Sequence, residues 1–175
     1  LATATNTDAD TGVAATVGLN IALMSNTASV GANAEITGDD VQVRAVMVSG
    51  EVNTFAARAL AGAASKETAV GGSISINYLD LETAASIGSG AAITATSGNV
   101  GVTAESRNEI QNIAGGAALS LQGGTGIGIA VSVNIINPLD TTASIGSSAN
   151  VSATGSVSVS ATGSLVAVTE DLPVI

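Results

Sequence analysis

The segment with the most evident chemistry is an acidic loop near the amino-terminal end, in which oxygen-bearing side chains alternate. Asn6, Asp8 and Asp10 stand at every second position, and Gly12 follows them. Calcium needs several hard oxygen ligands on a sharply turning backbone, so this spacing makes the loop a weak calcium candidate. In the EF-hand pattern the glycine comes one position earlier, and a glutamate stands where this chain has Val17. A solvated acidic turn is therefore the alternative interpretation.

Two acidic pairs are the other groups to which catalysis could be assigned. Asp39 and Asp40 are adjacent, and Asp80 and Glu82 would share one face of a strand. Paired carboxylates can cleave glycosidic bonds, but such sites gather cations and aromatic platforms in the same cleft. This chain has only four Lys and Arg residues, which are scattered, and one Tyr and one Phe. We therefore expect no enzymatic activity and no cofactor apart from the calcium candidate.

The composition excludes several further kinds of site. Cysteine and histidine are absent from the 175 residues, which removes disulfides, thiol catalysis, His-containing triads and zinc sites built on these residues. Four basic against fourteen acidic residues give a net charge of −10, so we expect no nucleic-acid partner. No stretch reaches the ~20 apolar residues that a membrane-spanning helix needs, so no membrane span is expected.

Three copies of one unit run through the chain. Ala28–Gly31 recurs as Ala85–Gly88 and again as Ala143–Gly146, at offsets of 57 and 58 residues. The extra residue in the third copy falls in Asn137–Asp140, which has the composition of a turn. We predict one β-solenoid domain over residues 1–175, with repeat units at about 13–69, 70–126 and 127–175, the last incomplete. The repeated structural positions are Asn20, Asn77 and Asn134 and the glycines Gly31, Gly88 and Gly146.

Within each unit the local period is two. Val17, Leu19 and Ile21 alternate with small or polar residues, and similar runs surround Ile74 and Ile129. This alternation predicts strands with one apolar face, which we expect to form the core. The repeated asparagines have the opposite parity, so we expect them at a turn or on the outer face.

Short strands, glycine turns and a long repeat together predict an all-β fold, a right-handed parallel β-solenoid (β-helix). With coils of the usual ~19 residues, each unit would hold about three coils, separating one repeated asparagine from the next by about three layers. Nine such coils, stacked ~4.8 Å apart, would make a rod about 40 Å long. Two longer coils per unit remain an alternative. An antiparallel β-sandwich is another, although it favours Asn-Gly hairpins, which the chain lacks.

The repeats also resemble those of a known group of proteins. The pattern Ala-Ser-Ile-Gly, then Ala-x-Ile/Val-Thr/Ser-Ala-Thr, then Gly-x-Val-x-Val-x-Ala is carried best by Ala85–Ala104 and Ala143–Ala161. It is similar to the repeats of large secreted filamentous adhesins of Gram-negative bacteria, of the filamentous-haemagglutinin-like and fusobacterial leukotoxin types. The resemblance implies secretion, display on the cell surface, and a β-helical shaft within a much longer polypeptide. It assigns a role to no individual residue.

We therefore predict a structural shaft segment of an extracellular bacterial adhesin or filament. Its expected partners are neighbouring repeats of the same or an identical chain, which could assemble end to end. The alternative is a binding module whose lateral face recognises glycan, calcium or ice. Ice-binding solenoids carry flat threonine arrays, for which the candidates here are Thr3, Thr5 and Thr7 and the pair Thr94 and Thr96.

Overall fold

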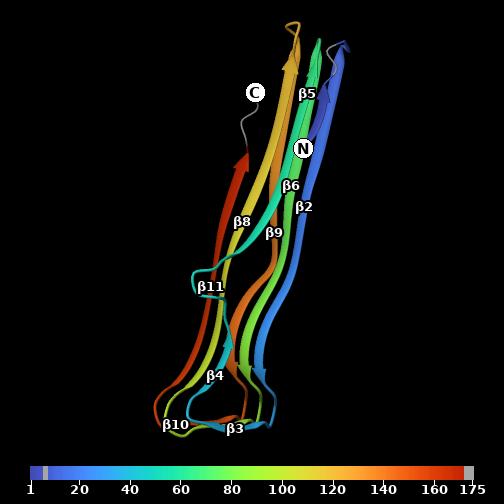
Figure 1. Ribbon diagram of the computed structural model, residues 1–175. Helices are drawn as coiled ribbons and strands as arrows, with labels where there is room; N and C mark the ends of the chain where they lie inside the picture. Colours follow the sequence, from blue (N-terminus) through green and yellow to red (C-terminus); the bar gives the residue numbers. More distant parts are fainter. Residues whose placement is uncertain (6–7, 172–175) are drawn as a thin grey trace.

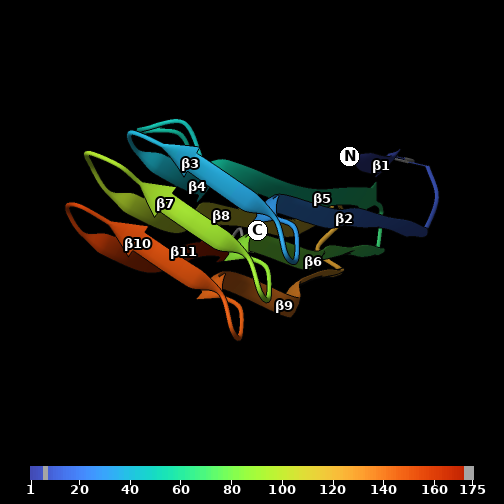
Figure 2. The same ribbon diagram turned by 90° about the horizontal axis from the view of Figure 1, so that it is seen from below.

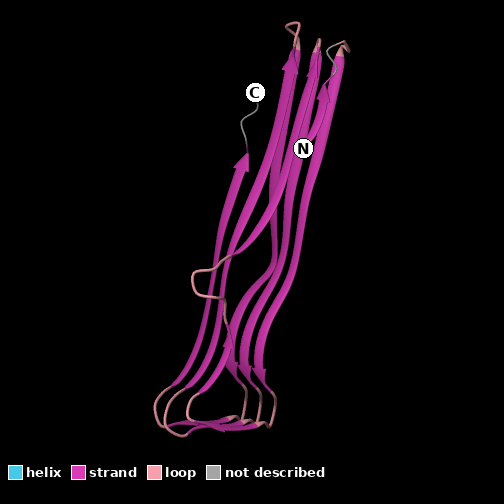
Figure 3. Ribbon diagram, in the orientation of Figure 1, coloured by secondary structure: helices cyan, strands magenta, loops and turns pink. Residues whose placement is uncertain are grey.

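The structure, a computed structural model, describes residues 1–5 and 8–171 of the chain. In these residues it contains strands, turns and loops but no helix, as Figure 3 shows. The strands are β1 (Ala2–Thr5), β2 (Thr11–Val30), β3 (Glu35–Gly38), β4 (Val41–Ala45), β5 (Asn53–Ser65), β6 (Thr68–Ile87), β7 (Ala92–Ala95), β8 (Val100–Ser120), β9 (Thr125–Ile145), β10 (Asn150–Ala153) and β11 (Val157–Asp171).

These strands form three sheets in which every pair of neighbours is parallel. Sheet A has the order β1-β5-β8-β11, with β4 also pairing with β8; sheet B is β2-β6-β9, and sheet C is β3-β7-β10. The chain runs the length of the molecule in sheet B, crosses the base in sheet C and returns in sheet A (Figure 1). Seen from below, the short strands of sheet C lie side by side across that base (Figure 2). The predicted all-β parallel β-solenoid is confirmed.

The predicted coil length is wrong. Thr11 pairs with Thr68 and Thr68 pairs with Thr125, so successive coils are offset by a whole repeat. Each repeat is therefore one coil, and the described strands form three coils, β2–β5, β6–β8 and β9–β11. The alternation accounts for the length, because Gly18 and Asn20 within the run from Val13 to Leu23 keep its period of two and do not end the strand.

Long coils make the molecule a flat slab instead of a rod. Strand β6 has 20 residues, and a strand of that length spans about 66 Å. Three coils stacked ~4.8 Å apart measure only about 14 Å along the stacking direction. The sheets therefore present broad lateral faces, and the stack is short.

The interior changes in character from one end of the slab to the other. At the end that carries sheet C, called the base here, an ordinary apolar core includes Val43, Ile87, Ile93 and Val102, none more than 7% exposed. Midway, Phe55, Leu79, Leu81 and Ile110 form a second cluster. Beyond it lies a thin part, called the blade, where sheets A and B are separated by Ala, Gly, Ser, Thr and Asn. The blade comprises residues 11–21, 58–65, 68–78, 112–120 and 125–135.

Glycines show how closely the two sheets approach in the blade. A Cβ atom at Gly116 would lie 2.5 Å from the carbonyl oxygen of Ile129 and 2.6 Å from that of Gly71, well inside ordinary contact distance. Because these are backbone atoms of the opposite sheet, no side-chain rotation could relieve the overlap. At this position the space between the sheets is therefore too narrow for any side chain.

For this reason sheet B has the opposite orientation to the one predicted. Val17 and Leu19 are 71% and 61% exposed, whereas Asn77 is fully buried. The apolar side of the alternation thus faces outward along the blade, and the small and polar side faces sheet A. Alternation alone defines two faces but does not say which is inner. The small residues that alternate with Val17 and Leu19 along the strand were the sequence signal that their side is the inner one.

The predicted turn at Asn137–Asp140 is also wrong. Strand β9 continues through it, and the extra residue is accommodated as a β-bulge: Leu79 pairs with Ile136 and Leu81 with Leu139. Pro138 lacks a backbone donor, but β9 is the outermost strand of sheet B, where a missing donor breaks no hydrogen bond to a further strand of this chain.

Candidate functional sites

An asparagine ladder runs through the interior of the blade. The Nδ2 atom of Asn20 donates to Oδ1 of Asn77 at 3.1 Å, and Nδ2 of Asn77 donates to Oδ1 of Asn134 at 3.2 Å. The prediction that these residues lie at turns or on the outer face, about three layers apart, is therefore wrong. They occupy adjacent coils because one repeat makes one coil. Stacked amides of this kind join like positions along a parallel β stack.

Asn112 extends the ladder across to sheet A. Its Nδ2 atom lies 3.0 Å from Oδ1 of Asn134 and 2.8 Å from the carbonyl oxygen of Val133. In return, Nδ2 of Asn77 donates to the carbonyl oxygen of Gln111 at 3.2 Å. Two buried acceptors nearby, Asn112 Oδ1 and Ser75 Oγ, have no hydrogen-bond partner. The network therefore joins like positions of adjacent coils and links the two sheets across the interior of the blade.

The repeated glycines Gly31, Gly88 and Gly146 lie where the chain leaves sheet B. A Cβ atom at Gly88 would be 2.6 Å from the backbone nitrogen of Ala32 in the coil below, and one at Gly146 would be 2.6 Å from that of Ser89. Close stacking of the turns therefore requires glycine at these two positions. Positive φ angles occur two residues further on, at Asn33 (57°), Gly90 (70°) and Ser148 (59°).

The second turn of each coil uses the predicted acidic pair Asp39 and Asp40 as a coil-to-coil contact. Oδ1 of Asp40 accepts a hydrogen bond from the backbone N–H of Asn99 at 2.7 Å. Oδ1 of Asn99 accepts one from the backbone N–H of Ser156 at 2.9 Å. Oδ1 of Asp39 accepts one from Thr96 Oγ1 at 3.1 Å. Each coil thus binds the backbone of the next, an arrangement with a structural use and no cleft for a substrate.

The other acidic pair shares one face of its strand, as predicted, and that face is the outer side of sheet B. Asp80 and Glu82 follow each other on the same side of β6, and Oε2 of Glu82 accepts a hydrogen bond from Ser25 Oγ at 3.5 Å. Among the residues that the structure describes, no three His, Cys, Asp or Glu side chains gather closely enough to hold a metal ion. Of the calcium candidate, Asn6 lies outside the described residues, and Asp8 and Asp10 lie in the turn before β2. Calcium binding stays a prediction.

The threonine candidates do not form one array. Thr3 and Thr5 belong to β1 in sheet A, whereas Thr94 belongs to β7 in sheet C. Thr7 lies outside the residues that the structure describes. Thr94 is flanked in register by Thr37 and Ser152, which makes a single row of hydroxyl groups across the base. Hydroxyl groups spaced in two dimensions, as an ice-matching surface needs, are not brought together by these positions.

A loop of residues 46–52 interrupts sheet A of the first coil, and the sequence prediction missed it. Strands β4 and β5 both pair with the continuous strand β8, at offsets of 59 and 55 residues, so the loop holds four residues more than the matching part of the next coil. Phe55 consequently pairs with Ile110 of β8. The sequence signal for this loop was the change in spacing between matching residues of the first two repeats on either side of Gly50.

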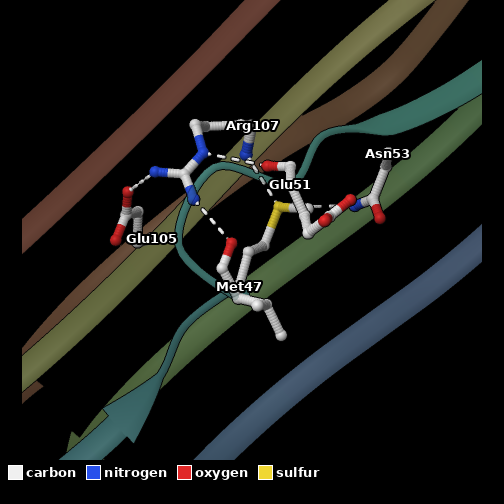
Figure 4. Close-up of polar contacts among 6 residues, drawn as sticks. Met47, Glu51, Asn53, Glu105 and Arg107 are labelled. Atoms are coloured by element: carbon white, nitrogen blue, oxygen red, sulfur yellow. Dashed lines mark hydrogen bonds and ion pairs between the residues drawn. The ribbon is translucent and has the colours of Figure 1, made fainter.

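Arg107 of the second coil holds this loop in place (Figure 4). Its guanidinium Nη2 donates to the carbonyl oxygen of Val48 at 3.0 Å, and Nε donates to that of Glu51 at 3.1 Å. The same group pairs with the carboxylate of Glu105, and the backbone N–H of Arg107 lies 3.1 Å from the sulfur of Met47. The polar cluster thus replaces the strand pairing that the loop interrupts.

Two hollows accompany these features. A cavity of about 170 Å³ behind the loop is lined by both methionines of the chain, Met24 and Met47, together with Asn53, Leu81 and Asn108. A shallow apolar depression of about 410 Å³ covers the outside of sheet A around Gly62, Ala117 and Leu119. The cavity lining also includes Asn26, Glu82 and Thr83. Glu82 and Thr83 are adjacent on β6, where successive side chains point to opposite faces of the sheet, so the strand does not direct this carboxylate and this hydroxyl toward each other.

Comparison with known proteins found no matching family model, no matching curated protein and no matching solved structure. The resemblance to filamentous adhesins therefore stays a prediction based on the repeats alone. No helix among the described residues has the length and apolar character needed to cross a membrane.

Proposed function

We propose that this chain is a structural segment of an extracellular bacterial surface protein, in which wide coils stack into a longer β-solenoid and no catalysis takes place. One observation carries the proposal. All 20 residues of β2 pair in unbroken register with the 20 residues of β6, so each repeat serves as the template for the next. The extracellular location is supported by the resemblance of the repeats to those of secreted adhesins.

The use of the polar side chains supports the same role. The asparagine ladder, the Asp40–Asn99–Ser156 contacts and the Arg107 cluster all join one coil to its neighbour. In an enzyme or a ligand-binding module, convergent polar groups would face a common open pocket instead. The described polar groups are used to hold coils in register.

The outermost strands indicate where further coils would attach. Strands β2 and β9 form the two edges of sheet B, and an edge of 20 or more residues is a strong template for another parallel strand. We infer that identical or similar repeats stack on these edges. Since each repeat adds only ~4.8 Å along the stack, such a segment contributes width more than reach.

Duplicating residues 70–126 between Gly126 and Ile127 tests the proposal. We expect each added copy to lengthen the particle by ~4.8 Å along the stacking direction only, as measured by small-angle scattering, with a proportional gain in β-sheet circular dichroism. A Gly/Ser linker of equal length at the same junction is the control and should enlarge the particle without adding β structure. Added copies that fold as a separate body, or that do not fold, would refute stacking.

A further inference from the structure

The outer face of sheet B carries a grid of fifteen side chains without a single charge. The positions lie in register on β2, β6 and β9, five from each strand. This set is called the apolar face here. Its rows are Val13, Val70 and Ile127; Ala15, Gly72 and Ile129; Val17, Ile74 and Val131; Leu19, Ile76 and Val133; and Ile21, Tyr78 and Ile135.

The apolar face is large for the surface of an isolated chain. It extends about 30 Å along the strands and about 14 Å across them, which is roughly 400 Å² in the plane of the sheet. Ten of its large aliphatic side chains are strongly exposed, from 36% at Val133 to 71% at Val17, whereas Val70 and Ile76 on the middle strand are half-buried. Because these side chains project from the sheet, the accessible area exceeds the planar figure and approaches the ~800 Å² per partner of a standard interface.

We propose that the apolar face packs against the same face of a second copy of this chain. Flat sheets with branched aliphatic side chains pack face to face about 10 Å apart, with the side chains of the two faces interdigitating. A second copy offers a face of the same length, composition and twist. This proposal does not depend on the stacking role, because stacking uses strand edges whereas pairing uses a sheet face.

The order of the rows makes the face complementary to itself. The second row is low at Ala15 and Gly72, which carry a methyl group and a hydrogen atom, and the fourth row is high at the matching positions, Leu19 and Ile76. A two-fold axis parallel to the stacking direction and passing over Ile74 would place Gly72 of each copy opposite Ile76 of the other. Such an axis keeps the two stacks parallel, so every further coil would extend the same interface, and the contact closes at two copies.

Charges around the face favour a protein partner over a lipid surface. Asp10 and Glu67 lie at the turns beyond the first row, and Asp80 and Glu82 lie beyond the last, whereas Lys66 is the one basic residue at the turns. The chain carries a net charge of −10 and no Trp. Faces that bind membranes combine apolar residues with basic and aromatic residues at the rim.

Two variants with the same composition test the pairing. Gly72→Glu places a carboxylate in the middle of the apolar face, and Gly62→Glu places one on the outside of sheet A, where a Cβ atom also meets nothing within 4 Å. We expect the unmodified chain and Gly62→Glu to sediment as dimers at roughly 100 µM, above the micromolar Kd typical of small interfaces. Gly72→Glu should sediment as a monomer. Circular dichroism shows whether both variants keep their β structure.

Ionic strength and vesicles complete the experiment. Because both copies are acidic, dimerisation should strengthen between about 50 mM and 500 mM salt as their repulsion is screened. An unmodified chain that stays monomeric, or equal dissociation of both variants, would overturn the proposal. Binding to phosphatidylcholine vesicles by a monomeric chain, lost in Gly72→Glu, would replace the second copy with lipid. Open-ended assemblies insensitive to Gly72→Glu would overturn pairing while leaving edge stacking intact.

Discussion

Adjacent glycines in β6 provide a direct test of the narrow blade. Gly71 faces sheet A, and a Cβ atom there would overlap the carbonyl oxygen of Ala117 and lie 3.1 Å from its carbonyl carbon and 3.3 Å from its nitrogen. Gly72 faces outward into open space. The same substitution, glycine to alanine, therefore adds the same methyl group to an overfilled and to an unfilled position of one strand.

We expect Gly71→Ala to lower the free energy of unfolding by about 2 kcal/mol, since forcing a methyl group into packed backbone costs about 1–3 kcal/mol. For a chain of this length that corresponds to a drop in Tm of about 4–8 °C. Gly72→Ala should be neutral or stabilise by up to ~1 kcal/mol, because alanine restricts the unfolded chain more than glycine does.

Urea unfolding followed by circular dichroism measures both values, at protein concentrations low enough to keep the chain monomeric. The comparison between the two variants removes effects of strand propensity that they share. If Gly71→Ala were as stable as Gly72→Ala, the sheets would not be held at the described separation, and the explanation for the outward apolar face would fail with it.

Two further predictions concern the polar contacts between coils. Replacing Asn77 with alanine should destabilise the fold by about 1–3 kcal/mol in urea unfolding, because it removes the acceptor of Asn20 Nδ2 and one of the donors to Asn134 Oδ1 in the interior. Asn20→Ala should lower the free energy of unfolding by less than Asn77→Ala does, since Asn20 lies on the outermost strand. Equal decreases for the two variants would mean that the ladder is not cooperative. Arg107→Gln should lower global stability by less than about 1 kcal/mol, as its contacts are partly exposed. It should instead speed amide exchange in residues 48–52, and unchanged exchange there would contradict the assigned role of Arg107.

The sequence predicts the kind of fold and the positions of the strands well, because alternation and repeats are local signals. It fails on coil length, since the prediction assumed a coil of ordinary size while the turn residues allow only two bends before the return through sheet A. That single error also misplaced Asn20, Asn77 and Asn134, which are neighbours only when one repeat is one coil.

The inward side of sheet B was predicted wrongly for a different reason. Burial of Val17 and Leu19 is the usual expectation, but it requires a space between the sheets that Gly71 and Gly116 do not leave.

The candidate sites were predictable only in part. The expectation that the acidic pairs are not catalytic stays a prediction, and their use in binding the next coil depends on which turns the fold stacks together. The Arg107 cluster depends on an insertion whose position shows only when β4 and β5 are both aligned on β8. Contacts between residues some 55–60 positions apart follow from the coil length, so they could not be deduced before it was known.

The loop of residues 46–52 shows that a coil can be interrupted without disturbing its neighbours. Strands β4 and β5 resume the same sheet on either side of it, because β8 runs unbroken beside both and sets their positions. Inserted residues therefore project laterally from the stack at the junction between β4 and β5. This junction is called the seam here, and the length of the chain can vary at it. A foreign peptide grafted at Ser49 and Gly50 would be displayed on the outside of sheet A, and repeats that differ only in what they carry at this seam could share one common framework.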